Sequence, residues 1–304
     1  MKLYAPEYYR SFACIADKCK HSCCVGWEID VDPDTLKKYK TLCDDYGKTI
    51  LSTVEEGETP HFRLCEGERC PHLDERGLCR IILGPGEDLL CDICREHPRF
   101  YHDTPRGREV GVGMACEEAC RLILSSQNYA TFVPVGETDD ECEPLDFDAT
   151  VHRDAMLKIL SDHSFPYAAR KEALCTRYGI PPRLLPQKEA QKLLSSLEYL
   201  TPDNREHFLR YDASIDTKGL DEQQLERALA YFIFRHVSLA GEVGEVRTAL
   251  CFSLFCEQLL VSTARARGVR DACDMIELAR TVSEEIEYSE ENTEKIKEKF
   301  AKIL

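Results

Sequence analysis

The sequence predicts a mainly α protein in which a loop-rich, cysteine-dense N-terminal region with short strands packs on an all-α C-terminal region. Thirteen of the 17 cysteines lie before residue 143, where Gly and Pro interrupt the apolar runs. After residue 150, apolar residues recur at intervals of three and four, which is typical of amphipathic helices. We therefore expect a cysteine-rich domain over 1–133, an acidic linker over 134–150 and a helical domain over 151–304.

Composition and charge indicate which kinds of molecule the chain is expected to bind. The chain has 304 residues with 43% hydrophobic content, which is enough to build a sizeable core. It carries 39 basic and 55 acidic residues, a formal net charge of −16, and it has no basic run that would follow a phosphate backbone. Nucleic acid is therefore not the expected partner, and an acidic surface suits a cationic substrate.

The high cysteine content has two common explanations, disulfides in a secreted protein or metal ligation in a reducing compartment. No apolar run follows Lys2 within the first ten residues, so we expect no secretory signal. No uncharged stretch reaches the ~18 to 20 residues that a membrane helix needs. The sequence therefore predicts a cytoplasmic protein with reduced thiols and no membrane segment.

Eight cysteines fall in two windows, 14–24 and 70–94, and their close spacing predicts a metal centre. Thiolates two to four residues apart reach a common ion or cluster when a turn brings their sulfurs together. Because adjacent side chains diverge, Cys23 and Cys24 are expected to serve different centres unless one of them is not a ligand. The predicted ligands are Cys14, Cys19, Cys23, Cys24, Cys70, Cys79, Cys91 and Cys94.

Local elements are expected around both windows. The segment 25–32 alternates apolar and acidic residues around Trp27, which indicates a short strand. Asp34 is the expected cap of a helix over 35–42. The turn residues 74–77 between apolar flanks predict a hairpin that brings Cys70 and Cys79 together.

The pair Cys91 and Cys94 has a second interpretation, a catalytic dithiol. Such a motif normally follows a strand in a βαβ unit, and no such pattern precedes it, so metal ligation is favoured. His97, Arg99 and Tyr101 follow as a polar group just beyond the pair.

In the segment 109–126, two glycines precede a predicted helix, which is only weak evidence for a nucleotide-binding loop. Gly111 and Gly113 lack the third glycine of the dinucleotide fingerprint. Glu117 and Glu118 suit the positive end of that helix.

Seven helices are expected after the linker, and the one over 222–240 has a wide apolar face that includes His236, interpreted as a core histidine. The expected ranges are 151–160, 166–178, 186–199, 222–240, 245–266, 271–287 and 291–304.

Zinc and an iron–sulfur cluster both remain open as the occupant of the metal centre. Structural zinc requires four ligands in two close pairs, which the second window alone supplies. The usual spacing of radical S-adenosylmethionine enzymes, C-x-x-x-C-x-x-C, is not present.

The cysteine windows and their flanks resemble the flagellin lysine-N-methylase family, which is itself similar to a broader group of zinc- or iron-chelating cysteine-cluster domains. The resemblance is dense from residue 1 to about 126. It is carried by segments 12–30, 68–73, 77–81, 90–94 and 97–100, which read FACIADKCKHSCCVGWEID, ERCPHL, GLCRI, LCDIC and HPRF.

This resemblance implies transfer of a methyl group from S-adenosylmethionine to lysine ε-amines, with flagellin as the expected substrate and a cysteine-bound [4Fe-4S] cluster. A lysine must lose its proton and be held in line with the methyl donor. The expected catalytic residues are Glu28, Tyr101 and Glu117. The expected contacts to S-adenosylmethionine are His97, Arg99, Trp27 and Glu118.

Two alternatives stay open at this stage. One is a metal-binding module without catalysis, which zinc binding alone would favour. The other is a related enzyme that modifies a different peptide. Nothing in the sequence fixes the oligomeric state.

Overall fold

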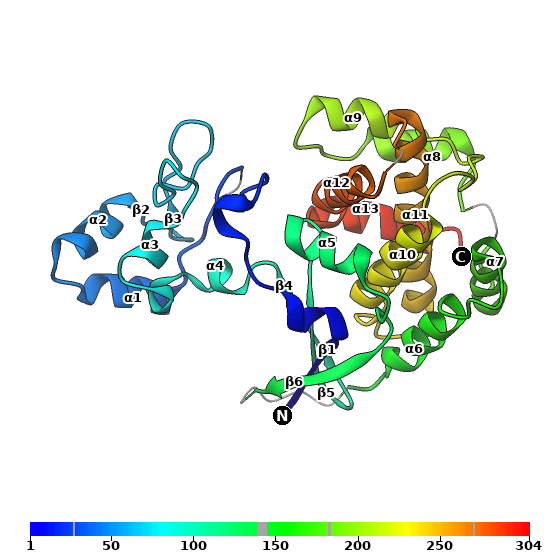
Figure 1. The fold of residues 1–304 in the computed structure, drawn as a ribbon, viewed down its shortest axis with the longest axis horizontal. Coiled ribbons are helices and arrows are strands. Elements are labelled where there is room, and N and C mark those ends of the chain that lie inside the picture. The colour runs from blue at the N-terminus through cyan, green and yellow to red at the C-terminus, as the bar shows by residue number, and fades with distance from the viewer. Residues whose placement is uncertain (27, 139–144, 182–183, 270) are drawn as a thin grey trace. The chain divides into compact units, whose positions relative to one another are not determined.

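The structure is a computed structural model that describes residues 1–26, 28–138, 145–181, 184–269 and 271–304. The chain forms two compact units (Figure 1). Residues 13–100 make up one, here called the cysteine unit. Residues 1–12 and 101–304 make up the other, here called the helical unit. The domain boundaries expected at 133 and 150 stay a prediction, and residues 139–144 of the expected linker lie outside the described residues.

The cysteine unit consists of short elements joined by loops, in line with the loop-rich region expected there. Its strands β2 and β3 pair antiparallel. In chain order its elements are η2 (Ala16–Lys18), α1 (Pro33–Thr41), α2 (Asp45–Thr53), β2 (Val54–Glu55), β3 (His61–Phe62), α3 (Arg80–Leu83), η3 (Glu87–Leu89) and α4 (Asp92–Glu96).

Helix α1 begins two residues earlier than the sequence predicted. Asp32, and not Asp34, is its N-cap: the Asp32 carboxylate accepts a hydrogen bond from the Thr35 backbone N–H at 2.8 Å. Pro33 follows as the first helical residue, where its fixed φ suits the helix and its missing N–H costs nothing. The described residues of the expected strand over 25–32, all but Trp27, form only isolated bridges, from Val25 to Arg69 and from Asp30 to His61.

The predicted turn between Cys70 and Cys79 is confirmed. Leu73 and Cys79 form an antiparallel bridge across it. The Asp74 carboxylate accepts hydrogen bonds from the backbone N–H groups of Arg76 and Leu78, at 2.8 and 2.9 Å. Gly77 closes the turn with φ of +77°, a conformation that favours glycine.

A four-stranded mixed sheet, which the sequence did not reveal, belongs to the helical unit. The strand order is β4-β5-β1-β6, with β1 parallel to β5 and antiparallel to β6. Its strands are β1 (Lys2–Pro6), β4 (Arg99–Thr104), β5 (Gly107–Val112) and β6 (Phe132–Glu137), and the 3₁₀ turn η1 (Glu7–Ser11) follows β1.

Helices make up the rest of the unit and confirm the mainly α prediction. All seven helices expected after the linker are found, and α9 was missed because its residues are polar, with only Phe208 buried. Helices α10 and α11 pack against each other in the centre of the unit (Figure 1). The helices are α5 (Glu117–Ser125), α6 (Ala149–Leu160), α7 (Tyr167–Tyr178), α8 (Gln187–Ser195), α9 (Pro202–Leu209), α10 (Glu222–Val237), α11 (Val243–Arg267), α12 (Ala272–Val282), a π-helical turn η4 (Ser283–Glu287) and α13 (Glu290–Ala301).

Helix α11 is the one described helix that is long and apolar enough to cross a membrane by length and composition. Sixteen of its 25 residues are buried by the other elements of the unit. A core helix of a soluble protein has the same composition, and the burial of α11 favours that interpretation.

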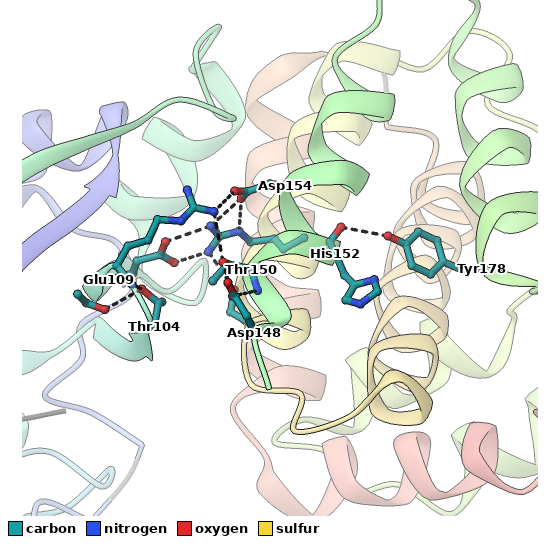
Figure 2. A network of polar contacts seen from close by, with 11 residues as sticks. Thr104, Glu109, Asp148, Thr150, His152, Asp154 and Tyr178 are labelled. Carbon is teal, nitrogen blue, oxygen red and sulfur yellow. Dashed lines mark hydrogen bonds and ion pairs between the residues drawn. The ribbon is translucent and has the colours of Figure 1, made fainter. Parts of the chain in front are cut away.

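A buried ion-pair network ties the sheet to the helices (Figure 2). Glu109 on β5 accepts hydrogen bonds from both terminal nitrogens of Arg153 on α6, and the two side chains are 8% and 1% exposed. Asp154 accepts from the Arg153 Nη2 at 2.7 Å and from Arg106 at 2.8 Å. The Arg153 guanidinium also lies 4.4 Å from the ring centroid of Phe132 on β6. One cation therefore joins β5, β6 and α6.

Candidate metal centre

Five of the eight predicted ligands gather in the core of the cysteine unit. Cys70 and Cys91 belong to the buried apolar cluster that contains Tyr39, Ile50 and Phe62. Three further cysteines pack against that cluster, and each of the five interacts electrostatically with at least three of the others. This group, here called the inner cysteine set, consists of Cys24, Cys70, Cys79, Cys91 and Cys94.

Backbone pairing brings the two windows together. The Cys70 N–H donates to the Cys24 carbonyl at 2.8 Å, and the Gly26 N–H donates to the Glu68 carbonyl at 3.0 Å. The turn after Cys70 then returns the chain to Cys79, which is the N-cap residue of α3. Contacts distant in sequence therefore place cysteines of both windows side by side.

The adjacent cysteines Cys23 and Cys24 have different environments. Cys23 is exposed, whereas Cys24 is partly buried and packs on the core. A hydrogen bond from Cys23 is the main reason that the pKa of Cys24 is lowered to about 7, with a smaller contribution from Arg69. Cys24 is therefore the better candidate of the pair for ligation, since the thiolate is the form that binds metal.

In the Cys91–Cys94 pair too, one thiol donates a hydrogen bond and the other accepts it. A hydrogen bond from Cys94 lowers the pKa of Cys91, and the same contact raises the pKa of Cys94. Burial raises the pKa of Cys70 to about 12, and neighbouring sulfurs add to the effect. Packing several thiols into a low-dielectric core disfavours their anions, and a bound metal cation reverses that balance.

Three predicted ligands stay outside this core. Cys14 is exposed and its sulfur accepts a hydrogen bond from the Ala16 N–H at 3.4 Å. Cys19 is partly buried and its thiol donates to the His21 carbonyl at 3.2 Å. Cys23 is the third. Across the residues that the structure describes, no group of three or more His, Cys, Asp or Glu side chains is already set around one metal position, so the ligand assignments stay predictions.

The donor set of the inner cysteines fits the metal groups expected from the sequence. Zinc and iron–sulfur clusters both take thiolate sulfur, and four sulfurs complete either site. Two of the five cysteines, Cys70 and Cys91, are buried in this apolar core, and the other three are partly buried against it. The set therefore supplies enough ligands for one such group with a thiol to spare.

The buried histidine of this unit was not predicted as functional. His72 donates or accepts a hydrogen bond at Nε2 with the Thr53 hydroxyl, at 2.9 Å, and its ring lies edge-on to Phe62 at 4.7 Å. Burial lowers the pKa of His72 to about 4, so the ring is neutral at physiological pH. The position two residues after Cys70 was the only sequence signal for it.

Three other predicted residues of the cysteine unit are described, and Trp27 lies outside the described residues. Glu28 is exposed, with its carboxylate 3.5 Å from the His61 Nε2. His97 is partly buried, and burial lowers its pKa to about 4. Arg99 donates to the Arg95 carbonyl at 3.2 Å.

The remaining predicted residues lie in the helical unit. Tyr101 on β4 has the Arg108 guanidinium 4.9 Å from its ring centroid. Glu117 and Glu118 occupy the first turn of α5, as expected, and Glu118 forms a two-point ion pair with Arg121, at 2.6 and 2.7 Å. The catalytic and cofactor-binding roles of these residues stay predictions.

Comparison with known proteins identifies relatives of the chain. No family model and no solved structure matches it. Lysine-N-methylases of Salmonella typhimurium and Salmonella choleraesuis are each 30% identical over 129 residues, which is 40% of this chain and 32% of theirs. The alignment thus spans about a third of the length of those two relatives. The flagellar biosynthetic protein FliU of Salmonella muenchen is 30% identical over 129 residues, which is 75% of its length. The chain belongs to the flagellin lysine-N-methylase family.

Proposed function

We propose that this protein is an S-adenosylmethionine-dependent lysine N-methyltransferase of the cytoplasm that uses a [4Fe-4S] cluster and modifies flagellin or a similar protein. The observation that carries this proposal is the inner cysteine set, because it gathers thiols from both windows in a member of the lysine-N-methylase family. The size and burial of that set support a resident metal group.

The inner cysteine set would hold the cluster. Three thiolates suffice for a [4Fe-4S] cluster with one open iron, and five thiols leave a choice among them. When bound, such a cluster would supply an iron that is able to chelate the amino and carboxylate groups of S-adenosylmethionine. This chelation would also account for the weak nucleotide-loop signal at Gly111 and Gly113.

The chain's own residues have two remaining tasks, to fix the methyl donor and to accept a proton. We assign the first to Trp27, His97, Arg99 and Glu118. A lysine ammonium must lose its proton before its nitrogen attacks, so a carboxylate or phenolate has to lie near it. We assign this task to Glu28, Tyr101 and Glu117. Glu118 is less suited to it because Arg121 already neutralises its carboxylate.

The charge of the chain supports a lysine-bearing protein as the substrate. A formal net charge of −16 attracts cationic segments and raises their rate of encounter. The name of the FliU relative places it in flagellar biosynthesis, which is compatible with flagellin as that substrate.

Methyl transfer tests the proposal. The full chain, purified without oxygen, is incubated with S-adenosylmethionine that carries a deuterated methyl group and with flagellin from the same organism. We expect deuterated methyl-lysine in the flagellin by mass spectrometry. The variant Cys70→Ser should lose this activity, because Cys70 is buried in the inner set, and the matched variant Cys43→Ser should retain it, because Cys43 is exposed. Unmodified flagellin with the metal-loaded wild type would contradict the assignment of the substrate.

A non-catalytic zinc module is the second candidate, and one observation favours it. The four cysteines of the second window all lie in the inner set, which meets the four-ligand requirement of structural zinc without the first window. Metal analysis separates the two candidates, since a zinc module would contain zinc and would not respond to S-adenosylmethionine. An enzyme with a different substrate would bind the methyl donor and methylate another peptide.

A further inference from the structure

Helix α1 lies against residues 89–92, here called the Cys91 turn. It makes one polar contact with the backbone on each side of Cys91. The two residues that make the contacts are Asp32, the N-cap of α1, and Tyr39, near its C-terminal end. They are seven residues apart, about two turns, so the two contacts are made from opposite ends of the helix. Neither was singled out in the sequence for a role at the metal centre.

Asp32 holds the backbone just after Cys91. One carboxylate oxygen accepts the Thr35 N–H and caps α1, and the other accepts the Asp92 N–H at 2.9 Å. A single side chain therefore fixes the start of α1 and the start of α4 to each other. Because Cys91 is the N-cap residue of α4, this contact constrains the backbone from which its sulfur projects.

Tyr39 holds the backbone just before Cys91 and also touches its sulfur. The Tyr39 hydroxyl donates to the Leu89 carbonyl at 2.7 Å and lies 3.6 Å from the Cys91 Sγ. The Tyr39 ring is fully buried and stacks with Phe62 at a centroid distance of 6.3 Å. A thiol at Cys91 is able to donate to the hydroxyl, but a thiolate only accepts, so the phenol proton then lies between two acceptors.

We propose that α1 is a clamp that positions Cys91 for metal ligation, with Asp32 and Tyr39 as positioning residues. This inference rests on the metal centre of the proposed function. Residues that hold the ligands of a metal typically matter almost as much as the ligands, and their loss lowers metal affinity by about 10-fold to 100-fold. The clamp would act by keeping the Cys91 sulfur in place before metal binds.

Two conservative variants remove one contact each and leave the rest of α1 intact. Tyr39→Phe keeps the stacked ring and removes only the hydroxyl. Asp32→Asn keeps a good helix cap, since Asn and Asp cap equally well. Its amide has only one acceptor oxygen, whereas the Thr35 and Asp92 N–H groups each use a separate oxygen of Asp32.

Matched controls make the same kinds of contact away from the inner cysteine set. Tyr199→Phe, in the helical unit, removes a hydroxyl that donates to the Leu194 carbonyl at 2.7 Å. Asp44→Asn changes the N-cap of α2, whose carboxylate accepts the Gly47 N–H at 2.7 Å. Neither control contact reaches the Cys91 turn.

The experiment measures how fast the full chain, as purified without oxygen, releases its metal to an excess of an iron- and zinc-binding chelator. Absorbance follows the release, and far-UV circular dichroism checks that every variant is folded. We expect both clamp variants to lose metal about 10-fold to 100-fold faster than wild type, and both controls to match wild type. Release at the wild-type rate from folded clamp variants would overturn the clamp and leave the proposed function standing. A wild-type chain without metal would overturn both.

Discussion

The ion pair between Arg153 and Glu109 provides the sharpest test of how the helical unit is held together. Glu109 lies on β5, the strand that leads into α5, where Glu117 and Glu118 are placed. We consider two changes, Glu109→Gln and Arg153→Met. Glu109→Gln removes the anion and keeps the shape of the side chain. Arg153→Met removes the cation that joins strands β5 and β6 to α6.

The size of each effect follows from burial and from the partners that remain. Breaking a buried pair by removing one partner costs about 3 to 5 kcal/mol, because a charge is left without compensation. Arg153→Met should fall in that range, since it leaves the carboxylates of Glu109 and Asp154 without their shared cation. Glu109→Gln should cost less, about 2 to 3 kcal/mol, because Asp154 still accepts from the Arg153 guanidinium and the new amide keeps one acceptor.

Urea unfolding at neutral pH, followed by far-UV circular dichroism, measures these free energies. The double variant should be more stable than the sum of the single effects implies, by at least about 1 kcal/mol, because the second change removes a charge that the first left uncompensated. Single effects below about 1 kcal/mol, or strict additivity, would refute the reasoning.

Three further predictions concern packing, protonation and ligation. Gly47→Ala in α2 should lower the free energy of unfolding in urea by about 1 to 3 kcal/mol, because the added Cβ would overlap the Cβ and the carbonyl oxygen of Leu42. Alanine is favoured over glycine in helices, so an increase in stability would show that this overlap is relieved and would contradict the prediction. Burial alone would raise the pKa of Glu287, but the cations and hydroxyls around it lower that pKa to about 2. The ionised carboxylate therefore stabilises the fold fully above pH 4.5, its ordinary pKa, and this stabilisation is lost as the pH falls toward 2. The difference in free energy of unfolding between wild type and Glu287→Gln should therefore shrink as the pH falls from 4.5 toward 2. A constant difference would contradict the lowered pKa of Glu287. Finally, Cys24→Ser should reduce the metal content of the purified chain whereas Cys23→Ser should not, and equal losses would show that burial does not select the ligand.

Local patterns in the sequence predicted the helices well and the caps less well. The apolar spacing of 222–240 and 245–266 gave α10 and α11 to within a few residues, because a buried face repeats along the chain. Asp32 and Asp34 both lie near the start of the same helix, and the backbone conformation there decides which carboxylate accepts the Thr35 N–H. Strand β1 was missed because its partners β5 and β6 lie more than 100 residues away.

The sequence predicted the region of the candidate site but not which of its residues are buried together. Cysteine spacing predicted that both windows contribute to one region, and the inner cysteine set contains members of each. Spacing did not separate Cys24 from Cys14 or Cys19, since burial depends on the backbone pairing with residues near Cys70. The contact of Tyr39 with Leu89 and Cys91 joins residues about 50 positions apart, and no local pattern marks it.

The most direct test of the central claim is the metal content of the full chain purified without oxygen, together with its visible spectrum before and after addition of S-adenosylmethionine. The account predicts roughly four irons and four sulfides per chain, and a spectrum that changes when the methyl donor binds. Zinc alone, with no spectral response to S-adenosylmethionine, would contradict the iron–sulfur methylase and leave a structural cysteine module.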